Sequence, residues 1–120
     1  MGQDAKAYLW FGTKPLRGCP SRGKFAECSK LGPGEAADAV GRMLPTGVML
    51  VYIPESEGKG LWALGISGTY HYHDWDNEAK RFELMNPWPD QCELLIHFCQ
   101  TSEWPYQQGE LGWYQGATYW

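Results

Sequence analysis

The amino-acid sequence predicts an α+β domain in which an antiparallel or mixed β-sheet carries two helices on one face. Short apolar runs rich in aromatic and β-branched residues alternate with two segments whose apolar residues recur at helical spacing, and Pro or Gly separates them. The chain has 120 residues, of which 43% are hydrophobic, so residues 1–120 can form a single domain with its own core. The expected element order is β-α-β-β-β-α-β, and a ferredoxin-like arrangement with one additional hairpin strand is a candidate topology.

The first three predicted elements are a strand, a long loop and a helix. Residues 6–12 (KAYLWFG) form an aromatic and apolar run that ends in Gly, which is typical of a strand. Residues 13–33 contain several Pro and Gly residues and little periodicity, so we expect a loop that is long for a compact domain. Pro33 suits the first position of the helix that follows, and Pro45 ends it. The apolar face of this helix consists of Ala36, Val40 and Met43.

Three strands are predicted in the middle of the chain. Residues 48–53 (VMLVYI) are apolar throughout, which indicates a central strand covered on both faces. After a turn at 54–60, residues 61–73 predict one long strand, and after a polar turn at 74–79, residues 81–85 predict a short returning strand. The residues of the long strand alternate between two faces, with Trp62, Leu64, Ile66, Tyr70 and Tyr72 on one and Ser67, Thr69, His71 and His73 on the other.

The C-terminal third predicts a second helix and a last strand. Residues 86–89 (NPWP) break the chain, and Asp90 then stands three residues before Glu93, the spacing of a capping box. We therefore expect a helix at 90–101. Residues 110–119 alternate Gly with aromatic residues, which indicates a last strand at an edge of the sheet. The apolar stripe of the helix consists of Cys92, Leu95, Ile96 and Cys99.

Positive charge is concentrated in the predicted basic loop, residues 13–33. The net charge is −4, yet residues 1–53 carry seven Lys or Arg and four Asp or Glu, whereas residues 54–120 carry three and ten. A basic segment on an acidic chain can attract an anionic partner or a small anionic ligand. The alternative is a solvated loop with no partner. The candidate anion-binding residues are Lys14, Arg17, Arg22 and Lys24.

One short motif is compatible with metal binding. His71 and His73 lie two positions apart, so on a strand both imidazoles point to the same side, about 6–7 Å apart along the chain. Asp74 or Asp76 could add an oxygen ligand. A metal site needs three or four ligands and the sequence defines no secure third one, so the alternative is a pair of histidines on a solvated strand face. We expect no bound cofactor.

The four cysteines are expected to be reduced thiols. No export signal is visible at the N-terminus, and the longest apolar run, residues 48–53, is too short to span a bilayer, so we expect a cytoplasmic protein without disulfides. Cys92 and Cys99 should be buried on the stripe of the second helix. Cys19 and Cys28 match no zinc-knuckle spacing. Either their basic neighbours lower a thiol pKa, or both are ordinary small residues.

Aromatic residues are unusually abundant, with seven Trp, seven Tyr and four Phe. A small domain cannot bury all of them fully, because Trp and Tyr carry polar groups that need water or a partner. Many of the aromatic residues in the segment 103–120 lie beside Gly or Pro, so we expect an aromatic-rich contact surface there. The alternative is that they cover the open face of the sheet. The expected contact residues are Trp104, Tyr106, Trp113, Tyr114 and Trp120.

Two classes of function fit these features, and no catalytic or phosphate-binding motif decides between them. The favoured hypothesis is a small non-catalytic binding protein, such as an inhibitor, adaptor or ligand-sequestering accessory protein of bacterial or phage origin. Its partner would be a protein or a small anionic ligand. The alternative is a small metal-dependent enzyme or metalloprotein that uses His71, His73 and Asp76. The sequence contains no specific nucleic-acid-binding motif, and it does not define the oligomeric state.

Overall fold

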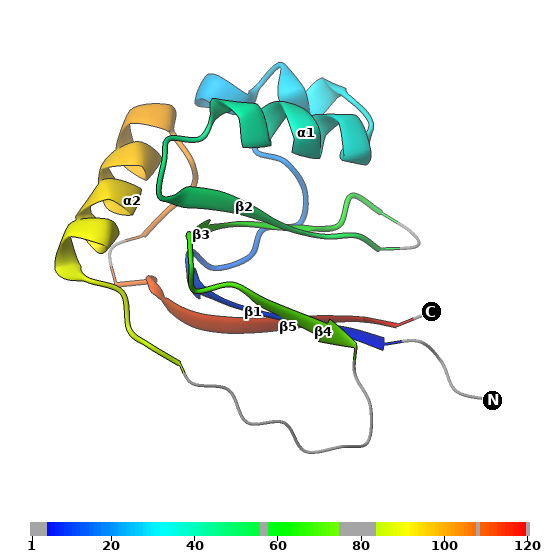
Figure 1. Cartoon of the computed structure of the whole chain (residues 1–120). Coiled ribbons are helices and arrows are strands. Elements are labelled where there is room, and N and C mark those ends of the chain that lie inside the picture. Colours follow the sequence, from blue (N-terminus) through cyan, green and yellow to red (C-terminus); the bar gives the residue numbers. More distant parts are fainter. Residues whose placement is uncertain (1–4, 56–57, 75–83, 108, 120) are drawn as a thin grey trace.

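The computed structural model describes residues 5–55, 58–74, 84–107 and 109–119. Its strands form one open antiparallel sheet which, together with two helices, confirms the predicted α+β class (Figure 1). In chain order the elements are β1 (Ala5–Gly12), α1 (Pro33–Met43), β2 (Val48–Ile53), β3 (Leu61–Ile66), β4 (His71–Asp74), α2 (Pro89–Ser102) and β5 (Gly112–Tyr119).

The β2–β3 hairpin forms the middle of three layers (Figure 1). Residues of both helices share a core with one face of this hairpin, and residues of β1 and β5 share a second core with its other face. This arrangement confirms that residues 48–53 are covered on both faces, although among the described strands β2 pairs only with β3. Val48, Leu50 and Tyr52 contact the helix-side core, whereas Met49, Val51 and Ile53 contact the other core.

The two helices bury the stripes that their sequences predict, with small differences. Helix α1 begins at Pro33, and helix α2 begins at Pro89 rather than Asp90. The side chain that closes the first turn of α2 is Gln91, whose Oε1 accepts a hydrogen bond from the Trp88 N–H at 2.7 Å, so Glu93 does not have the predicted capping role. Ala36 and Val40 of α1 are buried, as are Leu95, Phe98 and Cys99 of α2.

Strand β1 is the shared partner of three other strands. It pairs with β5 along eight residues on one edge, and with β4 and the end of β3 on the other edge. The predicted single strand at 61–73 is therefore wrong, because it divides into β3 and β4. Leu9 lies opposite His71 and Gly12 lies opposite Gly65. The six residue steps from Gly65 to His71 therefore lie opposite only three steps on β1. The additional residues form a turn at 67–70.

Where the turn at 67–70 interrupts the pairing of β1 with β3 and β4, two threonine side chains accept hydrogen bonds from strand N–H groups. Thr69 Oγ1 accepts a hydrogen bond from the Phe11 N–H at 3.1 Å and donates one to the Ile66 carbonyl at 2.6 Å. Thr13 exchanges two bonds with Leu64: its N–H donates to the Leu64 carbonyl at 2.8 Å, and its Oγ1 accepts from the Leu64 N–H at 2.9 Å. Because both threonines are buried, these bonds satisfy backbone groups that water cannot reach.

The long loop at 13–33 is attached to the fold at several points. Leu16 forms an isolated antiparallel bridge with Trp62 of β3. Two short 3₁₀ turns follow, Gly23–Phe25 and Cys28–Lys30, and each contributes one buried residue to the helix-side core. The loop therefore covers part of that core, although the sequence predicts no regular structure for it.

Two further expectations differ from the described chain. Of the predicted strand at 81–85, residues 81–83 lie outside the described residues, and residues 84 and 85 belong to no strand. The ferredoxin-like arrangement is not confirmed, because the strand order is β2-β3-β1-β4 with β5 beside β1. Within the described ranges, no helix combines the length and the apolar character that crossing a membrane requires.

We expect Gly12→Ala to unfold the protein or to lower its free energy of unfolding by at least about 3 kcal/mol. A Cβ atom at residue 12 would lie 2.0 Å from the Leu64 carbonyl oxygen and 2.7 Å from the Gly65 Cα, and neither backbone atom can move aside alone. Gly41→Ala in α1 is the control, because nothing lies within 4 Å of its Cβ position, and it should add up to about 1 kcal/mol. Urea unfolding measures both, and a Gly12→Ala variant as stable as the parent would contradict the close crossing of β1 and β3.

Candidate functional site

Three large apolar side chains are exposed within the five residues that precede α2. Met85 is 77% exposed, Trp88 is 74% exposed and Leu84 is 46% exposed. Single exposed apolar residues are normal on a protein surface, but a group of them marks an interaction site. We call Leu84, Met85 and Trp88 the Trp88 surface.

The Trp88 surface is held at its C-terminal end and at its centre. At its C-terminal end, the Trp88 N–H donates to Gln91 Oε1, and Pro89 occupies the first position of α2. At its centre, Asn86 Oδ1 accepts a hydrogen bond of 3.1 Å from the indole N–H of Trp113 in β5. The side chain of Trp88 takes no part in these bonds, so a fixed backbone presents a large aromatic ring to solvent.

Through Trp113, the surface adjoins the Phe11 side of the β1–β5 pair, where the partly buried Phe11 packs against the helix-side core. The Trp113 ring contacts the Phe11 ring edge-on, with 5.5 Å between centroids and 86° between planes. Phe11 and Trp113 lie opposite each other in the ladder, so both point away from the core that Trp10 and Tyr114 enter on the neighbouring positions. The half-buried Trp113 side chain therefore connects the segment of the Trp88 surface, through Asn86, to Phe11 of β1.

Other exposed apolar residues do not form such a group. Tyr72 is 51% exposed, but its ring contacts Tyr8 at 5.1 Å and Lys6 Nζ lies 5.9 Å from its centroid. Leu31 lies in the long loop, and Leu94 packs beside Gly47 in the connection between α1 and β2. Within the described chain, the Trp88 surface is thus the place where three large exposed apolar side chains fall within five residues.

The predicted aromatic contact residues are divided among different environments. Trp104 is only 2% exposed and packs edge-on against Phe25 at 5.2 Å, so it is a core residue, contrary to the prediction that it contacts a partner. Tyr106 packs on the same helix-side core. Tyr114 stacks on Trp10 at 5.9 Å in the second core, and its hydroxyl donates to the Glu110 carbonyl. Of the expected contact residues, Trp113 alone adjoins the Trp88 surface, and Trp120 lies outside the described residues.

The predicted basic residues are exposed, and one of them, Lys24, lies near the C-terminal end of α2. Lys24 Nζ lies 5.7 Å from the centre of the Phe98 ring, and the backbone of Gly23 approaches Ser102 and Glu103. The last turn of α2 contains no basic residue, so nearby cations of the loop can interact favourably with the negative end of its dipole. This explains basic residues here without a ligand. The four candidates are Lys14, Arg17, Arg22 and Lys24, and their anion-binding role stays a prediction.

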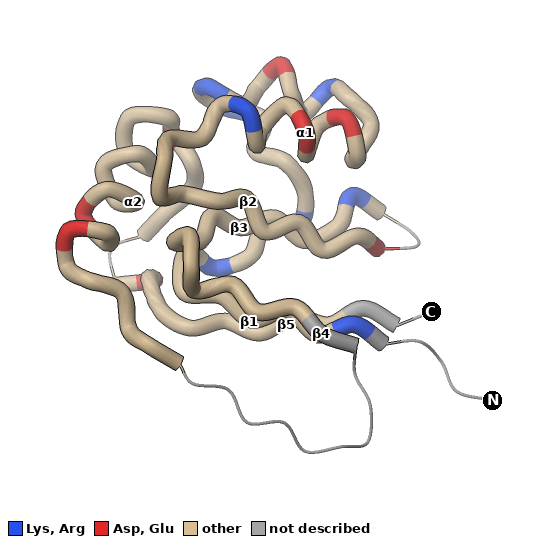
Figure 2. The backbone as a smooth tube through the Cα atoms, viewed as in Figure 1, with Lys and Arg blue, Asp and Glu red and all other residues tan. Residues whose placement is uncertain are grey.

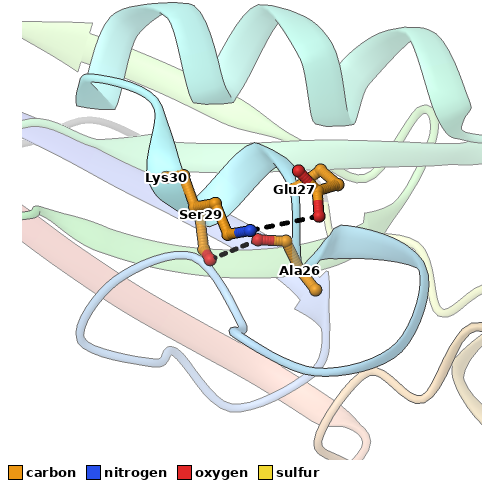
Figure 3. Close-up of polar contacts among 4 residues, drawn as sticks. All are labelled: Ala26, Glu27, Ser29 and Lys30. Carbon is orange, nitrogen blue, oxygen red and sulfur yellow. Dashed lines mark hydrogen bonds and ion pairs between the residues drawn. The ribbon is translucent and has the colours of Figure 1, made fainter.

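Acidic residues interrupt the positive charge of this region. Figure 2 shows Lys and Arg interspersed with Asp and Glu around α1 and the loop before it. In the loop itself, Lys30 Nζ forms an ion pair of 3.2 Å with Glu27, and in the same turn the Ser29 hydroxyl donates a hydrogen bond of 2.6 Å to the Ala26 carbonyl (Figure 3). Both ionic side chains are exposed, so the pair contributes little stability, but it reduces the charge available to an anion.

The histidine motif is only partly visible. In strand β4, His71 lies opposite Leu9 and His73 lies opposite Ala7 on β1. The side chain of His73 and all of Asp76 lie outside the described residues. Among residues that the structure does describe, no three His, Cys, Asp or Glu side chains gather as metal ligands. The metal site stays a prediction.

All four cysteines are free thiols. Burial, and secondarily the neighbouring Cys28, raises the pKa of Cys19 to about 11, so the prediction that basic residues lower a thiol pKa is wrong for this residue. Burial raises the pKa of Cys99 to about 12, and it also raises the pKa of Cys92. Cys99 is buried as predicted, whereas Cys92 is partly exposed. These thiols are therefore weak nucleophiles at neutral pH.

We expect Cys19 in the native protein to react with iodoacetamide about 100-fold more slowly at pH 8 than in the urea-unfolded chain. A pKa near 11 instead of 9.0 lowers the reactive thiolate fraction by that factor, because two pH units separate the two values. The native rate should rise as the pH approaches 11. Peptide mapping by mass spectrometry measures the rate, and equal rates in the native and unfolded protein would contradict the burial of this thiol.

Comparisons with known proteins give no match: no protein-family model, no curated protein and no solved structure corresponds to this chain. A proposal about its function therefore has to start from the chemistry of its own surface. The three exposed apolar side chains of the Trp88 surface are the feature that a folded core does not explain.

Proposed function

We propose that the protein is a non-catalytic binding protein whose Trp88 surface inserts into an apolar pocket of a protein partner. The observation that carries this proposal is the 74% exposure of Trp88 on a backbone that Gln91 and Asn86 hold in place. Tryptophan is enriched among the residues that dominate binding energy at protein interfaces. Exposing so large an apolar ring to water is unfavourable unless a partner covers it.

The arrangement lowers the entropic cost of association. The hydrogen bonds of Asn86 and of the Trp88 N–H restrain the segment before a partner arrives, so less backbone freedom is lost on binding. Met85, three residues before Trp88 in the same exposed segment, has a flexible and polarizable side chain that can adapt to an irregular pocket. A rigid anchor next to an adaptable neighbour is well suited to a protein–protein contact.

The charge beside the surface indicates the chemistry of the partner. Asp90 and Glu93, in the first two turns of α2, are both exposed next to Trp88. An apolar pocket with basic side chains on its rim would complement this combination. Of the two kinds of partner that the sequence suggests, a protein suits this surface better than a small anionic ligand, which the adjacent carboxylates would repel.

The cytoplasm is the compartment that we propose for this activity. Four free cysteines, with Cys28 close enough to Cys19 to contribute to its raised pKa, are typical of a reducing environment. Met85 and the free thiols would also be exposed to oxidation elsewhere.

Trp88→Ala should weaken partner binding by about 30-fold or more, which corresponds to the 2 kcal/mol of a strong interface anchor. The partner is first captured with the parent protein as bait and identified by mass spectrometry, and its Kd for each purified variant is then measured by calorimetry. Met85→Ala should weaken binding as well. Leu31→Ala is the matched control, because Leu31 is 44% exposed but lies in the long loop, and its Kd should equal that of the parent.

Two results would contradict the proposal. The first is a partner whose Kd does not change in Trp88→Ala and Met85→Ala, provided that the unfolding midpoints show both variants to be folded. The second is one bound metal ion per chain that disappears in His71→Ala and His73→Ala, together with a loss of activity. That second result would instead support the metalloprotein alternative.

A further inference from the structure

Strand β5 has one edge that no described strand covers. Its other edge pairs with β1 from Gly112 to Tyr119, eight residues in continuous register. The sheet order ends there, because within the described chain β5 pairs with no strand other than β1. An uncovered edge presents unpaired backbone N–H and C=O groups to its surroundings.

The hydrogen bonds of β1 identify which residues of β5 have free backbone groups. The Phe11 N–H points to Thr69, away from β5, so odd-numbered residues of β1 bond toward β3 and β4. Even-numbered residues of β1 therefore bond to β5, where Tyr8 lies opposite Gly116 and Trp10 lies opposite Tyr114. The N–H and C=O groups directed to the free edge belong to the alternate residues Trp113, Gln115 and Ala117.

This edge lacks the features that usually prevent edge-to-edge pairing. Residues 112–119 (GWYQGATY) include no charged residue and no Pro, and their register with β1 has no bulge. The chain as a whole has a net charge of −4, so two copies repel each other over much of their surface. At a neutral strand, two copies can approach without that repulsion.

We propose that two copies of this chain associate through their β5 edges, pairing antiparallel about a twofold axis at Gln115. With this axis Gln115 lies opposite Gln115 of the second copy, where two side-chain amides can hydrogen-bond. Trp113 lies opposite Ala117 on one face, and Tyr114 lies opposite Gly116 on the other. Each large ring thus lies opposite a small residue. The free-edge N–H and C=O groups of one copy can hydrogen-bond to the free-edge C=O and N–H groups of the second copy.

The side-chain sizes favour this register over its neighbours. An axis at Trp113 would bring two indole rings face to face at the same position, and an axis at Ala117 would leave Trp113 without an opposite residue in β5. Of these three axes, only the one at Gln115 places both Trp113 and Tyr114 opposite small residues. The pairing depends on the β5 edge and not on the Trp88 surface, so it stands or fails independently of the proposed function.

A charge exchange at residue 115 tests the axis directly. The parent chain should approach twice the 13.6 kDa mass of one chain as its concentration rises, as measured by light scattering after gel filtration. Gln115→Lys and Gln115→Glu should each be monomeric, because a like charge would lie directly opposite itself. An equimolar mixture of the two variants should recover the dimer. Gln100→Lys and Gln100→Glu, on the exposed side of α2, are the controls and should behave as the parent.

A second variant separates loss of pairing from loss of folding. Gln115→Pro removes only the N–H that points to the free edge, so the β1–β5 ladder keeps its bonds while the dimer should be lost. Circular dichroism confirms that each variant is folded. A parent that is monomeric at every concentration, a dimeric Gln115→Lys variant, or a mixture that stays monomeric would each overturn the proposal.

Discussion

The close crossing of β1 over β3 is the constraint on which the rest of the structure depends. Gly12 and Gly65 meet there without side chains, and the threonine hydroxyls of Thr13 and Thr69 satisfy the backbone groups that the crossing separates from a regular ladder. Because the strands come so close, the chain turns from one layer into the next at this point. The β2–β3 hairpin therefore lies between the helices and the β1–β5 pair, and it is covered on both faces.

The three layers explain how a small domain accommodates so many aromatic residues. Trp62 and Trp104 enter the helix-side core, whereas Trp10 and Tyr114 belong to the second core, between the β2–β3 hairpin and the β1–β5 pair. Two cores provide more buried positions than a single sheet face would. Trp88 differs from these residues because it precedes a helix in a segment flanked by two prolines, where no repeating pattern turns its side chain toward either core.

Helix α2 separates the Trp88 surface from the basic loop that the sequence suggests for anion binding. Its N-terminal end carries the Trp88 surface and exposed carboxylates, and its C-terminal end lies near Lys24 and the basic loop. Ten residues separate Trp88 from Phe98, which corresponds to about 15 Å along the helix axis. The Trp88 surface and Lys24 therefore belong to different parts of the molecule, and Lys24 can interact favourably with the negative end of the helix dipole.

The sequence by itself determined the local elements, because apolar spacing and Pro or Gly breaks are properties of neighbouring residues. Residues 48–53 form the strand predicted for them, and α2 occupies 89–102 where 90–101 was expected. Only the tertiary structure decided that residues 61–73 divide into two strands and that Trp104 is buried while Trp88 is exposed. Burial depends on which layers meet, and contacts such as Thr13 with Leu64 join residues 51 positions apart, which no local pattern records.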